Sequence, residues 1–464
     1  MTTYLNPVVS LYANDNDALI PEHWANEGLM ILTENMVMAN LVHRDFEDMV
    51  ASYGDVVNTR RPGEFGIRRR DDATAVVAQD AVATNVAVPL NQYFYEHFVI
   101  KDGEASKSFQ DLVEMYLEPA MISIANGIDR VLLGQVHEFL ANTVGGLGLL
   151  SSTTSYDTVL AARQKLIENK AGAAGRNLVV SPSGETALLK DQTFVTADKK
   201  GDDGTALREA SLGRILGMNT WMDQNTPLVV ATTADTASTT TTAVEPAGET
   251  NIAVTNTTGV TVGCFTTIVG DEQPRYITAT GAGPDVTLDA GLVSGTASGA
   301  AITYYKACAI KNAAGYAAGE GKQILVDGYT AGKYPRVGQL LAIGVGAARR
   351  TYTVIESWDG GASDRYLLLD RPLEVAVINN QACFPGPAGG YNFCFHREAL
   401  ALVTRPLALP ASNLGVRAFQ AVYKDVPMRI AMQYDIASAG TKVTLDMLAG
   451  VQTLDTNLGV VMLG

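Results

Sequence analysis

Helical periodicity stops at Thr226-Pro227 and does not return until after Gly390. The break opens on the low-complexity stretch ATTADTASTTTT, and the residues that follow show turn signals and β-branched alternation. Helical patterns lie on both sides of this region. In a chain of 464 residues, which is long enough for several domains, the sequence therefore predicts an α/β or α+β body interrupted by a β-rich insertion at residues 228–390.

A weak internal repeat runs through the predicted insertion. The offset between its two runs grows from 72 to 81 residues, as loop insertions between duplicated β units would produce. We expect two tandem β units, small barrels or sandwiches, at 250–306 and 322–387, with chance similarity as the alternative. The matched positions are Ile252, Val254, Gly263, Ile268, Tyr276, Leu288, Asp289 and Leu292 in the first run, and Ile324, Val326, Gly338, Ile343, Tyr352, Leu369, Asp370 and Leu373 in the second.

Ahead of the insertion the chain alternates between helical and extended patterns. Residues 20–46 have helical spacing and predict an N-terminal helical arm. Residues 47–103 combine turn residues with small and β-branched residues, which predicts a long two-stranded excursion. A second helical pattern runs from Ser108 to Val136, and Pro119 is expected to kink it or to begin a new segment.

Shorter elements flank the insertion on both sides. The spacing predicts an amphipathic helix at 157–169 and a short buried strand followed by a turn at 176–182. After the insertion we expect a helix at 396–403, a strand at 426–435 and a short turn of helix at 446–450. Together these elements predict a body that is discontinuous in sequence.

The charge balance is acidic, with 34 Lys and Arg against 49 Asp and Glu, a formal net charge of −15. This excess excludes a protein whose whole surface binds nucleic acid through basic residues, so we expect any DNA contact to be local or loose. No Lys or Arg precedes Arg44, and no apolar run reaches the roughly 18–20 residues of a membrane helix. We therefore expect a soluble protein that is made in the cytosol and has no membrane partner.

Motifs for catalysis or metal binding are absent from the sequence. The five histidines have no metal-ligand spacing, the segment GYAAGEGK lacks the glycine spacing of a phosphate loop, and no G-x-S-x-G motif occurs. We expect no enzyme, no metal and no cofactor. The four cysteines include no C-x-x-C pair, and we expect them to be reduced and mostly buried: Cys264, Cys308, Cys383 and Cys394.

One dense cluster of charges lies in the predicted excursion. A solvated face is the simpler explanation, but five arginines on a projecting element of an acidic protein also fit docking onto the carboxylates of a neighbouring subunit, because guanidinium groups bind carboxylates bidentately. The candidate interface residues are Arg60, Arg61, Arg68, Arg69, Arg70, Asp71 and Asp72.

Six blocks of sequence, taken in order, resemble the tailed-bacteriophage major capsid (coat) proteins of the P-twenty-two-like branch. The N-terminal blocks are EGLMILTENMVMANLVHRDFEDMVASYGDVVNTRRPGEF and AVPLNQYFYEHFVIKDGEASKSFQDLVEMYLEPAMISIANGIDRVLL. The blocks before the insertion are RNLVVSPSGETALLKD and ALREASLGRILGMNTWMDQNTP, and those after it are FCFHREALALVTRPLALP and VPMRIAMQYDIASAGTKVTLDMLAGVQTL.

This resemblance implies the HK-ninety-seven-type capsid fold, an α+β fold with an inserted β-rich domain. It implies an N-terminal arm, an extended loop, a peripheral domain with a long spine helix, and a discontinuous apical domain. Mapped onto this sequence, the arm is 1–48, the extended loop 49–103, the spine helix with part of the peripheral domain 104–150, the first apical part 151–227, the insertion 228–390, and the second apical and peripheral part 391–464.

The function implied is that of a major capsid subunit, which forms hexamers and pentamers and closes an icosahedral shell around double-stranded DNA. The implied partners are other copies of the chain, a separate scaffolding protein, a portal protein at one vertex, a decoration protein and non-specifically packaged DNA. The implied location is the virion, after assembly in the host cytoplasm. The alternative is a β-rich adhesin or capsid-decoration module, which the Thr-rich stretch favours and the helical patterns at 20–46 and 108–140 argue against.

Overall fold

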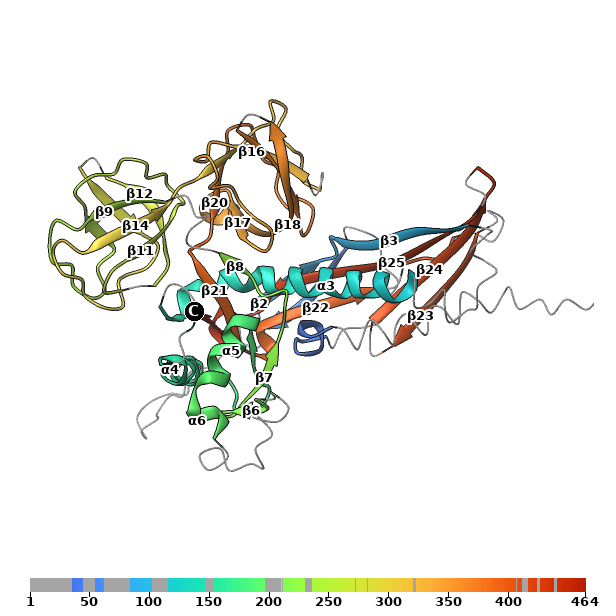
Figure 1. Cartoon of the computed structure of the whole chain (residues 1–464), viewed down its shortest axis with the longest axis horizontal. Coiled ribbons are helices and arrows are strands. Elements are labelled where there is room, and N and C mark those ends of the chain that lie inside the picture. The colour runs from blue at the N-terminus through green and yellow to red at the C-terminus, as the bar shows by residue number, and fades with distance from the viewer. Residues whose placement is uncertain are drawn as a thin grey trace, which may run out of the picture.

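The protein is mixed α+β, with many strands and few helices, in agreement with the predicted fold class (Figure 1). No helix in the described part of the chain is long and apolar enough to cross a membrane. The computed structural model describes residues 36–44, 55–61, 84–101, 116–146, 150, 153–196, 210, 212–229, 236–271, 273–281, 283–319, 323–361, 363–405, 407–410, 416–423, 426–437 and 440–464.

A seven-stranded sheet flanked by helices forms one part of the body. Its strands run in the order β4 (Thr143–Gly145), β26 (Gly459–Leu463), β21 (Gly389–His396), β5 (Arg176–Val180), β7 (Met218–Met222) and β6 (Arg214–Ile215), with β8 (Leu228–Val229) paired to β21. The helices α4 (Ser155–Glu168) and α5 (Pro182–Lys190) share a hydrophobic core with it, and α6 (Gln192–Val195) follows. Strands from both sides of the insertion meet here, since β5 pairs with β21.

An elongated antiparallel sheet forms the other part of the body and extends to the right in Figure 1. Its central strand β25 pairs with β3 along one edge and with β24 and then β22 along the other, and β23 lies beyond β24. The long helix α3 lies along this sheet and contacts β3 and β25. The bounds are β3 (Gln92–Lys101), β22 (Leu400–Arg405), β23 (Arg417–Tyr423), β24 (Val426–Asp435), β25 (Gly440–Thr453) and α3 (Glu118–Gly134).

Three short 3-10 helices connect parts of the body: η3 (Gln135–Asn142) continues α3, η6 (Arg397–Ala399) separates β21 from β22, and η8 (Thr456–Leu458) precedes β26. The predicted two-stranded excursion is present as β1 (Val56–Arg61) and β2 (Thr84–Pro89), which pair antiparallel. The β1–β2 pair joins the body where Val88 and Leu90 pack against β22 and β25. Ahead of it lies one turn of 3-10 helix, η1 (Met38–Asn40).

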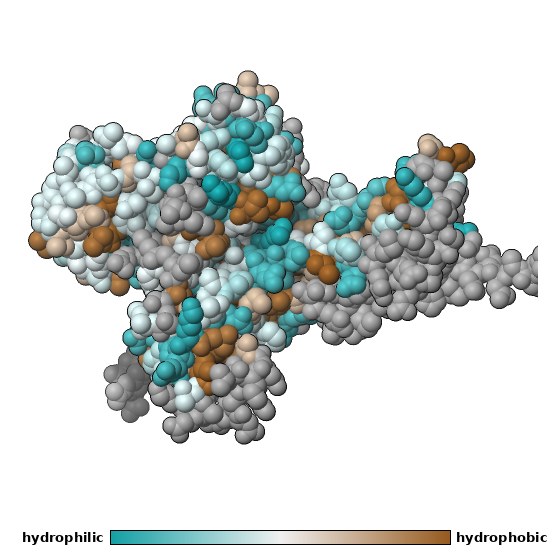
Figure 2. Space-filling view, in the orientation of Figure 1, coloured by the Kyte–Doolittle hydropathy of each residue, from teal (hydrophilic) through white to brown (hydrophobic). Residues whose placement is uncertain are grey.

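The insertion contains two β assemblies, which stand above the body in Figure 1. The first β unit is a six-stranded sheet in the order β10-β13-β12-β11-β14-β9, whose edge strands approach each other at a Thr241–Val254 bridge. Its strands are β9 (Thr236–Thr240), β10 (Asn251–Ala253), β11 (Phe265–Ile268), β12 (Arg275–Thr280), β13 (Asp285–Leu288) and β14 (Ala301–Tyr305). Figure 2 shows a pale, weakly polar surface over this unit, in keeping with its many Thr and Gly residues.

The second assembly is a closed barrel in the order β15-β16-β19-β18-β17-β20. Its strands are β15 (Cys308–Ile310), β16 (Gln323–Asp327), β17 (Leu340–Ile343), β18 (Arg350–Gly361), β19 (Asp364–Leu369) and β20 (Ala382–Pro385), with the 3-10 turn η5 (Gly346–Ala348) before β18. When the six strands of each unit are numbered along the chain, the barrel has the strand order 1-2-5-4-3-6. The first β unit has the same order once its β9 is placed beside β10, where the Thr241–Val254 bridge joins their ends.

Several predicted elements are confirmed. The strand predicted at 426–435 is β24, and the helix predicted at 157–169 is α4. The α-helical part of α3 begins at Glu118 with Pro119 in its first turn, where a proline is tolerated because no helical bond needs its missing N–H. The strand predicted at 176–182 is β5, but the turn predicted after it is the start of α5, where the Ser181 hydroxyl accepts the Gly184 N–H at 3.1 Å.

Two predicted helices are wrong. Residues 396–403 form the end of β21, η6 and most of β22, and residues 446–450 lie inside β25. The β22 part of the first segment and the whole of the second are buried on both faces, so their apolar residues run on without the alternation that marks a half-exposed strand. Most of the helix predicted at 20–46 lies outside the described residues.

Candidate functional site

The arginine cluster predicted to form an interface lies mostly outside the described residues. Arg60 and Arg61 end β1, where they are in register with Asn85 and Thr84 of β2. Their role at subunit contacts stays a prediction. Arg68, Arg69, Arg70, Asp71 and Asp72 fall in a part of the chain that the structure does not describe.

The described residues that hold the insertion on the body meet at the C-terminal end of α3, a contact that we call the spine junction. Gly134 closes α3, and a Cβ at this position would lie 3.4 Å from Asp370 Oδ2 and 3.5 Å from Arg371 Nη1 of the barrel. A helix C-terminus carries partial negative charge, so the guanidinium of Arg371 is favourably placed there. The absence of a side chain at Gly134 lets the barrel approach this closely.

Arg371 is the centre of the spine junction, and its side chain is 2% exposed. Its Nη1 donates to Asp370 Oδ2 at 2.8 Å, its Nε to Glu374 Oε1 at 2.9 Å, and its Nη2 to the Thr351 carbonyl at 2.5 Å. Its guanidinium carbon also lies 4.8 Å from the centre of the Tyr352 ring. Every face of this buried cation therefore has a partner.

The charges in the spine junction depend on one another. Burial opposes the charge on Arg371, but the Asp370 and Glu374 carboxylates outweigh burial and raise the pKa of Arg371 above its ordinary value. Burial raises the pKa of Asp370, against the lowering effect of Arg371. Removal of either partner would leave an uncompensated charge inside the protein.

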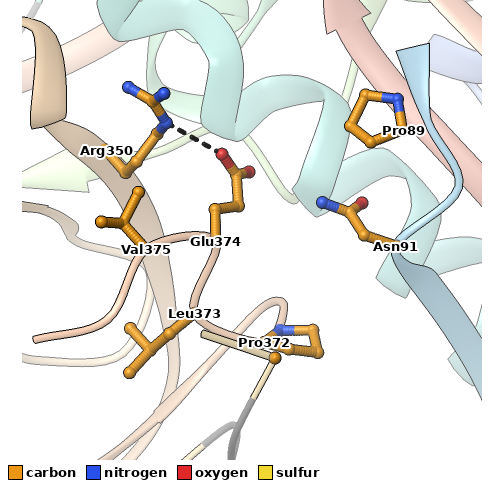
Figure 3. A pocket seen from close by; sticks show the side chains of 8 residues that line it. Pro89, Asn91, Arg350, Pro372, Leu373, Glu374 and Val375 are labelled. Carbon is orange, nitrogen blue, oxygen red and sulfur yellow. Dashed lines mark ion pairs between the residues drawn. The ribbon is translucent and has the colours of Figure 1, made fainter. Parts of the chain in front are cut away.

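A cleft of about 320 Å³ opens beside this network, between the barrel and the residues that link β2 to β3 (Figure 3). Glu374 extends its second oxygen to Arg350, with Oε2 3.1 Å from Nε. Pro89 and Asn91 lie across the cleft from this ion pair. The cleft is thus the place where the end of β2 faces the barrel.

His137, on η3, lines a neighbouring cleft together with Arg371 and Glu374 of the barrel. Its Nδ1 is 2.7 Å from the carbonyl oxygen of Gly134. Burial, with a further contribution from the cations of Arg371, Arg349 and Arg350, lowers the pKa of His137 to about 3. The imidazole is therefore neutral at physiological pH, and Nδ1 is the nitrogen that donates to the carbonyl.

The N-terminal segment is anchored about one helical turn earlier on α3. Asp129 is 1% exposed, and its carboxylate accepts the N–H of Val37 at 2.8 Å and of Ala39 at 3.3 Å. The chain then reaches β22, where His43 donates its N–H to the Leu400 carbonyl at 3.1 Å. The arm is therefore attached to both α3 and the elongated sheet.

Asp129 lies near a second buried carboxylate, Asp223. Burial, followed by the charge of Asp223, raises the pKa of Asp129 to about 8. Asp223 accepts the N–H of Asn225 at 2.8 Å through Oδ1, while its Oδ2 has no hydrogen-bond partner among the described residues. The arm therefore rests on a carboxyl group that retains its proton to an unusually high pH.

The first β unit is joined to the barrel at a contact that we call the clamp junction. Gly263 has no room for a side chain, because a Cβ would lie 2.6 Å from the Phe384 ring and 2.7 Å from Val345 Cγ1. Its φ of +98° is also in the region that favours glycine. The two units therefore fit together through a glycine backbone.

Arg349 fills the rest of the clamp junction. Its guanidinium carbon lies 4.3 Å from the ring centre of Phe265, 4.8 Å from Tyr276 and 5.5 Å from Phe384, and its Nη1 donates to the Gly263 carbonyl at 3.0 Å. Burial lowers the pKa of Arg349 to about 10. Its Nη2 has no hydrogen-bond partner within the described ranges.

These groups position parts of the chain and bring together no catalytic set. Among the described residues, no group of three or more His, Cys, Asp or Glu side chains could hold a metal ion. The arrangement can connect an arm, a long helix and two β units, and its chemistry is that of interfaces.

Sequence reasoning did not predict either junction, although it noted Gly263, Tyr276, Tyr352 and Asp370 as positions of the internal repeat. One signal was available for the spine junction, because the pair Asp370-Arg371 directly follows the apolar run that ends at Leu369. A second was Asp129, which interrupts an apolar helical face next to Ile128. No sequence signal marks Arg349, because its aromatic partners are far apart in the chain.

No protein-family model matches the chain, and no curated protein matches it in sequence. Solved structures that resemble it in fold include one from Mycobacterium phage Che8, with 11% identity, a TM-score of 0.42, and coverage of 92% of this chain and 90% of the other. The capsid structure of cyanophage P-SCSP1u has 9% identity and a TM-score of 0.42, with coverage of 91% and 90%. The virus-like particle from Pyrococcus furiosus has 7% identity and a TM-score of 0.34, with coverage of 95% and 98%. Each of these TM-scores is below 0.5.

Proposed function

We propose that this chain is the major capsid protein of a tailed double-stranded DNA phage, with the HK-ninety-seven-type fold, and that it assembles through hexamers and pentamers into an icosahedral shell around the genome. The observation that carries the proposal is the agreement between six ordered blocks of sequence and the architecture of the described residues. The blocks that resemble the spine helix and the start of the extended loop correspond to α3 and to β1. Scaffolding, portal and decoration proteins would be its other partners.

The elongated sheet supports a role in contacts between copies. Its far end, where β24 runs into β25, exposes apolar side chains, with Ile436 86% and Tyr434 53% accessible. Figure 2 shows hydrophobic surface at the tip of this end. Exposed apolar groups gathered on a projecting edge are typical of surfaces that another protein covers.

The proposed division of the chain follows the resemblance. The arm at 1–48 would include the residues held by Asp129, the extended loop at 49–103 would include β1 and β2, and 104–150 would include α3. The apical domain would combine 151–227 with part of 391–464, since β5, β6 and β7 of the first range share the seven-stranded sheet with β21 and β26, whereas β22 to β25 belong to the elongated sheet. The insertion at 228–390 would stand on the outer face of the shell.

We infer further that the two β assemblies are copies of one module. Equivalent backbone bonds support this, because Gly263 N–H donates to the Ile277 carbonyl as Gly338 N–H donates to Val354. Likewise, the Gly248 N–H donates to the Leu292 carbonyl at 2.8 Å in the first β unit, and the Gly319 N–H donates to the Leu373 carbonyl at 2.7 Å in the barrel. Since these bonds make Ile277 equivalent to Val354, the residue before each, Tyr276 and Thr353, is also equivalent. The sequence repeat had instead matched Tyr276 with Tyr352, which is one residue earlier.

Electron microscopy of the purified full-length chain tests the capsid proposal. Closed shells or sheets of capsomers, alone or with a scaffolding protein, are the expected result. A chain that stays monomeric under all assembly conditions, or that binds only to the outside of preformed shells, would instead support the adhesin or decoration alternative.

The arginine cluster provides a sharper test of how copies meet. Reversal of charge in the combined change Arg68→Glu, Arg69→Glu and Arg70→Glu should leave a folded subunit with an unchanged melting temperature but abolish shell formation. Single exposed ion pairs contribute only about 0–1 kcal/mol, so the effect depends on their repetition at every subunit contact. The matched triple change to lysine keeps the charge and should assemble. Normal assembly of the glutamate variant with a defect only in DNA packaging would assign the arginines to the genome.

A further inference from the structure

Two of the four cysteines face each other inside the barrel. Cys308 lies on β15 and Cys383 on β20, the first and last strands, and the two residues are direct partners in the antiparallel register. They are 3% and 0% exposed. The Cys308 thiol donates to the Cys383 carbonyl oxygen, with Sγ and O 3.6 Å apart. Burial, followed by the nearby Cys308 side chain, raises the pKa of the Cys383 thiol.

The backbone geometry at this pair suits a covalent bond. Directly opposed residues of antiparallel strands have Cα atoms about 4.5–5.5 Å apart. Disulfides span Cα separations of about 4.4–6.8 Å. Both side chains belong to the same hydrophobic core of the barrel, so they extend to the same side of their strands.

We propose that Cys308 and Cys383 are a site of oxidative modification, at which an intramolecular disulfide joins the first and last strands of the barrel. This inference goes beyond capsid function and does not depend on it. The oxidant would be a small disulfide such as oxidised glutathione.

The reaction balances in two exchange steps. One cysteine loses its proton and its thiolate attacks a sulfur of glutathione disulfide, which forms a mixed disulfide and releases one glutathione thiolate. The second cysteine then loses its proton and attacks the protein sulfur of the mixed disulfide, which releases the other glutathione. The two protons end on the two glutathione thiols, so the protein is oxidised by two electrons and glutathione disulfide is reduced.

Local opening of the barrel gives the oxidant access. The closed barrel shields both sulfurs, and the raised pKa of Cys383 keeps its thiolate scarce. However, β15 is only three residues long and pairs with each neighbour through two residues. Such a short strand can separate without unfolding the rest of the protein, and the disulfide would then keep it in place.

The first β unit offers an internal control, because it has the same strand pairing without thiols. The strands equivalent to β15 and β20 are β9 and β14, and Ile302 there pairs with Thr239 at the position equivalent to the cysteine pair. The remaining cysteines lie elsewhere: Cys264 is in the first β unit, and Cys394 Sγ lies 3.1 Å from Met218 Sδ in the seven-stranded sheet. The cysteine pair is therefore particular to the barrel and is not demanded by its fold.

The test is to incubate the purified full-length chain with oxidised glutathione, unfold it, alkylate the free thiols and map the peptides by mass spectrometry. We expect the free thiols to fall from four to two, and a single cross-linked product, two hydrogen atoms lighter, that joins Cys308 to Cys383. Hydrogen exchange at the amide of Ile310, whose N–H donates to the Gln381 carbonyl at 2.9 Å, measures how often β15 separates from the chain at β20, and the incubation is made many times longer than that exchange time. The oxidised barrel should then exchange more slowly at Ile310 and unfold at a higher urea concentration.

The matched variant carries Cys308→Thr and Cys383→Ile, the pair that the first β unit uses at this register. It should keep both remaining thiols free and show no change in exchange or urea midpoint with glutathione. Four free thiols in the wild type after complete exchange at Ile310, a stable glutathione adduct, or a cross-link to Cys264 or Cys394 would each overturn the proposal.

Discussion

Two arginines hold the two junctions of the insertion, and they do so by different chemistry. At the spine junction Arg371 is enclosed by two carboxylates and a backbone carbonyl. At the clamp junction Arg349 lies among three aromatic rings, with one carbonyl as its hydrogen-bond partner. The same residue type therefore serves in one place as a counter-ion and in the other mainly as a flat packing group.

The difference determines what each junction would lose without its arginine. Loss of the Arg371 side chain leaves the buried Asp370 carboxylate with no neutralising partner and leaves Glu374 with Arg350 alone, which is costly. Loss of the Arg349 side chain exposes rings that another apolar side chain can cover. The barrel thus meets the body through a charge network of its own residues that packs against Gly134 of α3, whereas the first β unit is attached to the barrel by close packing around Gly263 and Arg349.

The largest expected effect is the difference in stability loss when each of the two arginines is replaced by methionine. Arg371→Met should lower the free energy of unfolding by about 3–5 kcal/mol, because it leaves the buried Asp370 carboxylate unpaired. Arg349→Met should cost at most about 1 kcal/mol, because the thioether can pack on the rings and one guanidinium nitrogen has no partner to lose. Urea unfolding of both variants measures the contrast, and equal losses would show that the two junctions do not differ in kind.

The next largest effect compares two glycines at equivalent positions. Gly263 and Gly338 have φ values of +98° and +81°, so alanine is strained at both, by roughly 1–2 kcal/mol. Only Gly263→Ala also forces a Cβ against Phe384 and Val345, which adds about 1–3 kcal/mol, since no atom lies within 4 Å of a Cβ at Gly338. Thermal unfolding gives the two losses. A Gly338→Ala variant as unstable as Gly263→Ala would refute the close contact at the clamp.

A third prediction concerns the pH dependence of the spine junction. His137 has a folded-state pKa of about 3 against an ordinary 6.5, so the unfolded chain takes up its proton first and stability falls as pH drops below about 6.5. Between pH 7 and pH 5.5 this amounts to about 1 kcal/mol. His137→Gln removes the titration and keeps a donor for the Gly134 carbonyl. When the pH falls from 7 to 5.5, the free energy of unfolding of the variant should therefore decrease by about 1 kcal/mol less than that of the wild type.

The comparison must be made between variant and wild type at each pH. Asp129 has a raised pKa of about 8, so its contribution changes in the opposite sense, with stability falling as pH rises from about 4 to 8. This contribution is present in both proteins and is removed by the difference. Identical pH profiles for the wild type and His137→Gln would contradict the assignment of His137.

The smallest effect is expected at the exposed side of the same charge network. Arg350 pairs with Glu374 at 3.1 Å, but its side chain is 40% exposed. Arg350→Met should therefore change the free energy of unfolding by no more than about 1 kcal/mol, and the change should shrink further in high salt. A loss as large as that of Arg371→Met would mean that burial is not what distinguishes the two arginines.

Local patterns in the sequence predicted much of the fold. The bounds of β24 were predicted without error, and the shift in composition after Pro227 marks the passage from β8 into the insertion. The prediction failed where strands are buried on both faces, as at β22, because a continuous apolar run has no period that separates strand from helix. Pairing between strands far apart in sequence, such as β3 with β25, has no local signal at all.

The candidate site was less accessible to sequence reasoning than the fold. The predicted interface residues Arg68, Arg69 and Arg70 are consecutive in the sequence. The residues of the two junctions are far apart in the sequence and come together only in the folded protein. Gly134, for example, precedes the first β unit in the sequence and Arg371 follows it, yet the two residues lie side by side. Only an unusual local neighbour, such as the Asp370-Arg371 pair after an apolar strand, could have indicated one of them.

The pairing of β3 with β25 also governs the order in which the chain can acquire its structure during synthesis. When β3 (Gln92–Lys101) leaves the ribosome, its partner β25 (Gly440–Thr453) is still about three quarters of the chain away. Each β unit of the insertion, in contrast, finds all its strand partners within its own short segment and can fold as soon as it emerges. The nascent chain must therefore carry β3 as an unpaired strand while the insertion folds behind it, and this interval is when the subunit is most exposed to aggregation.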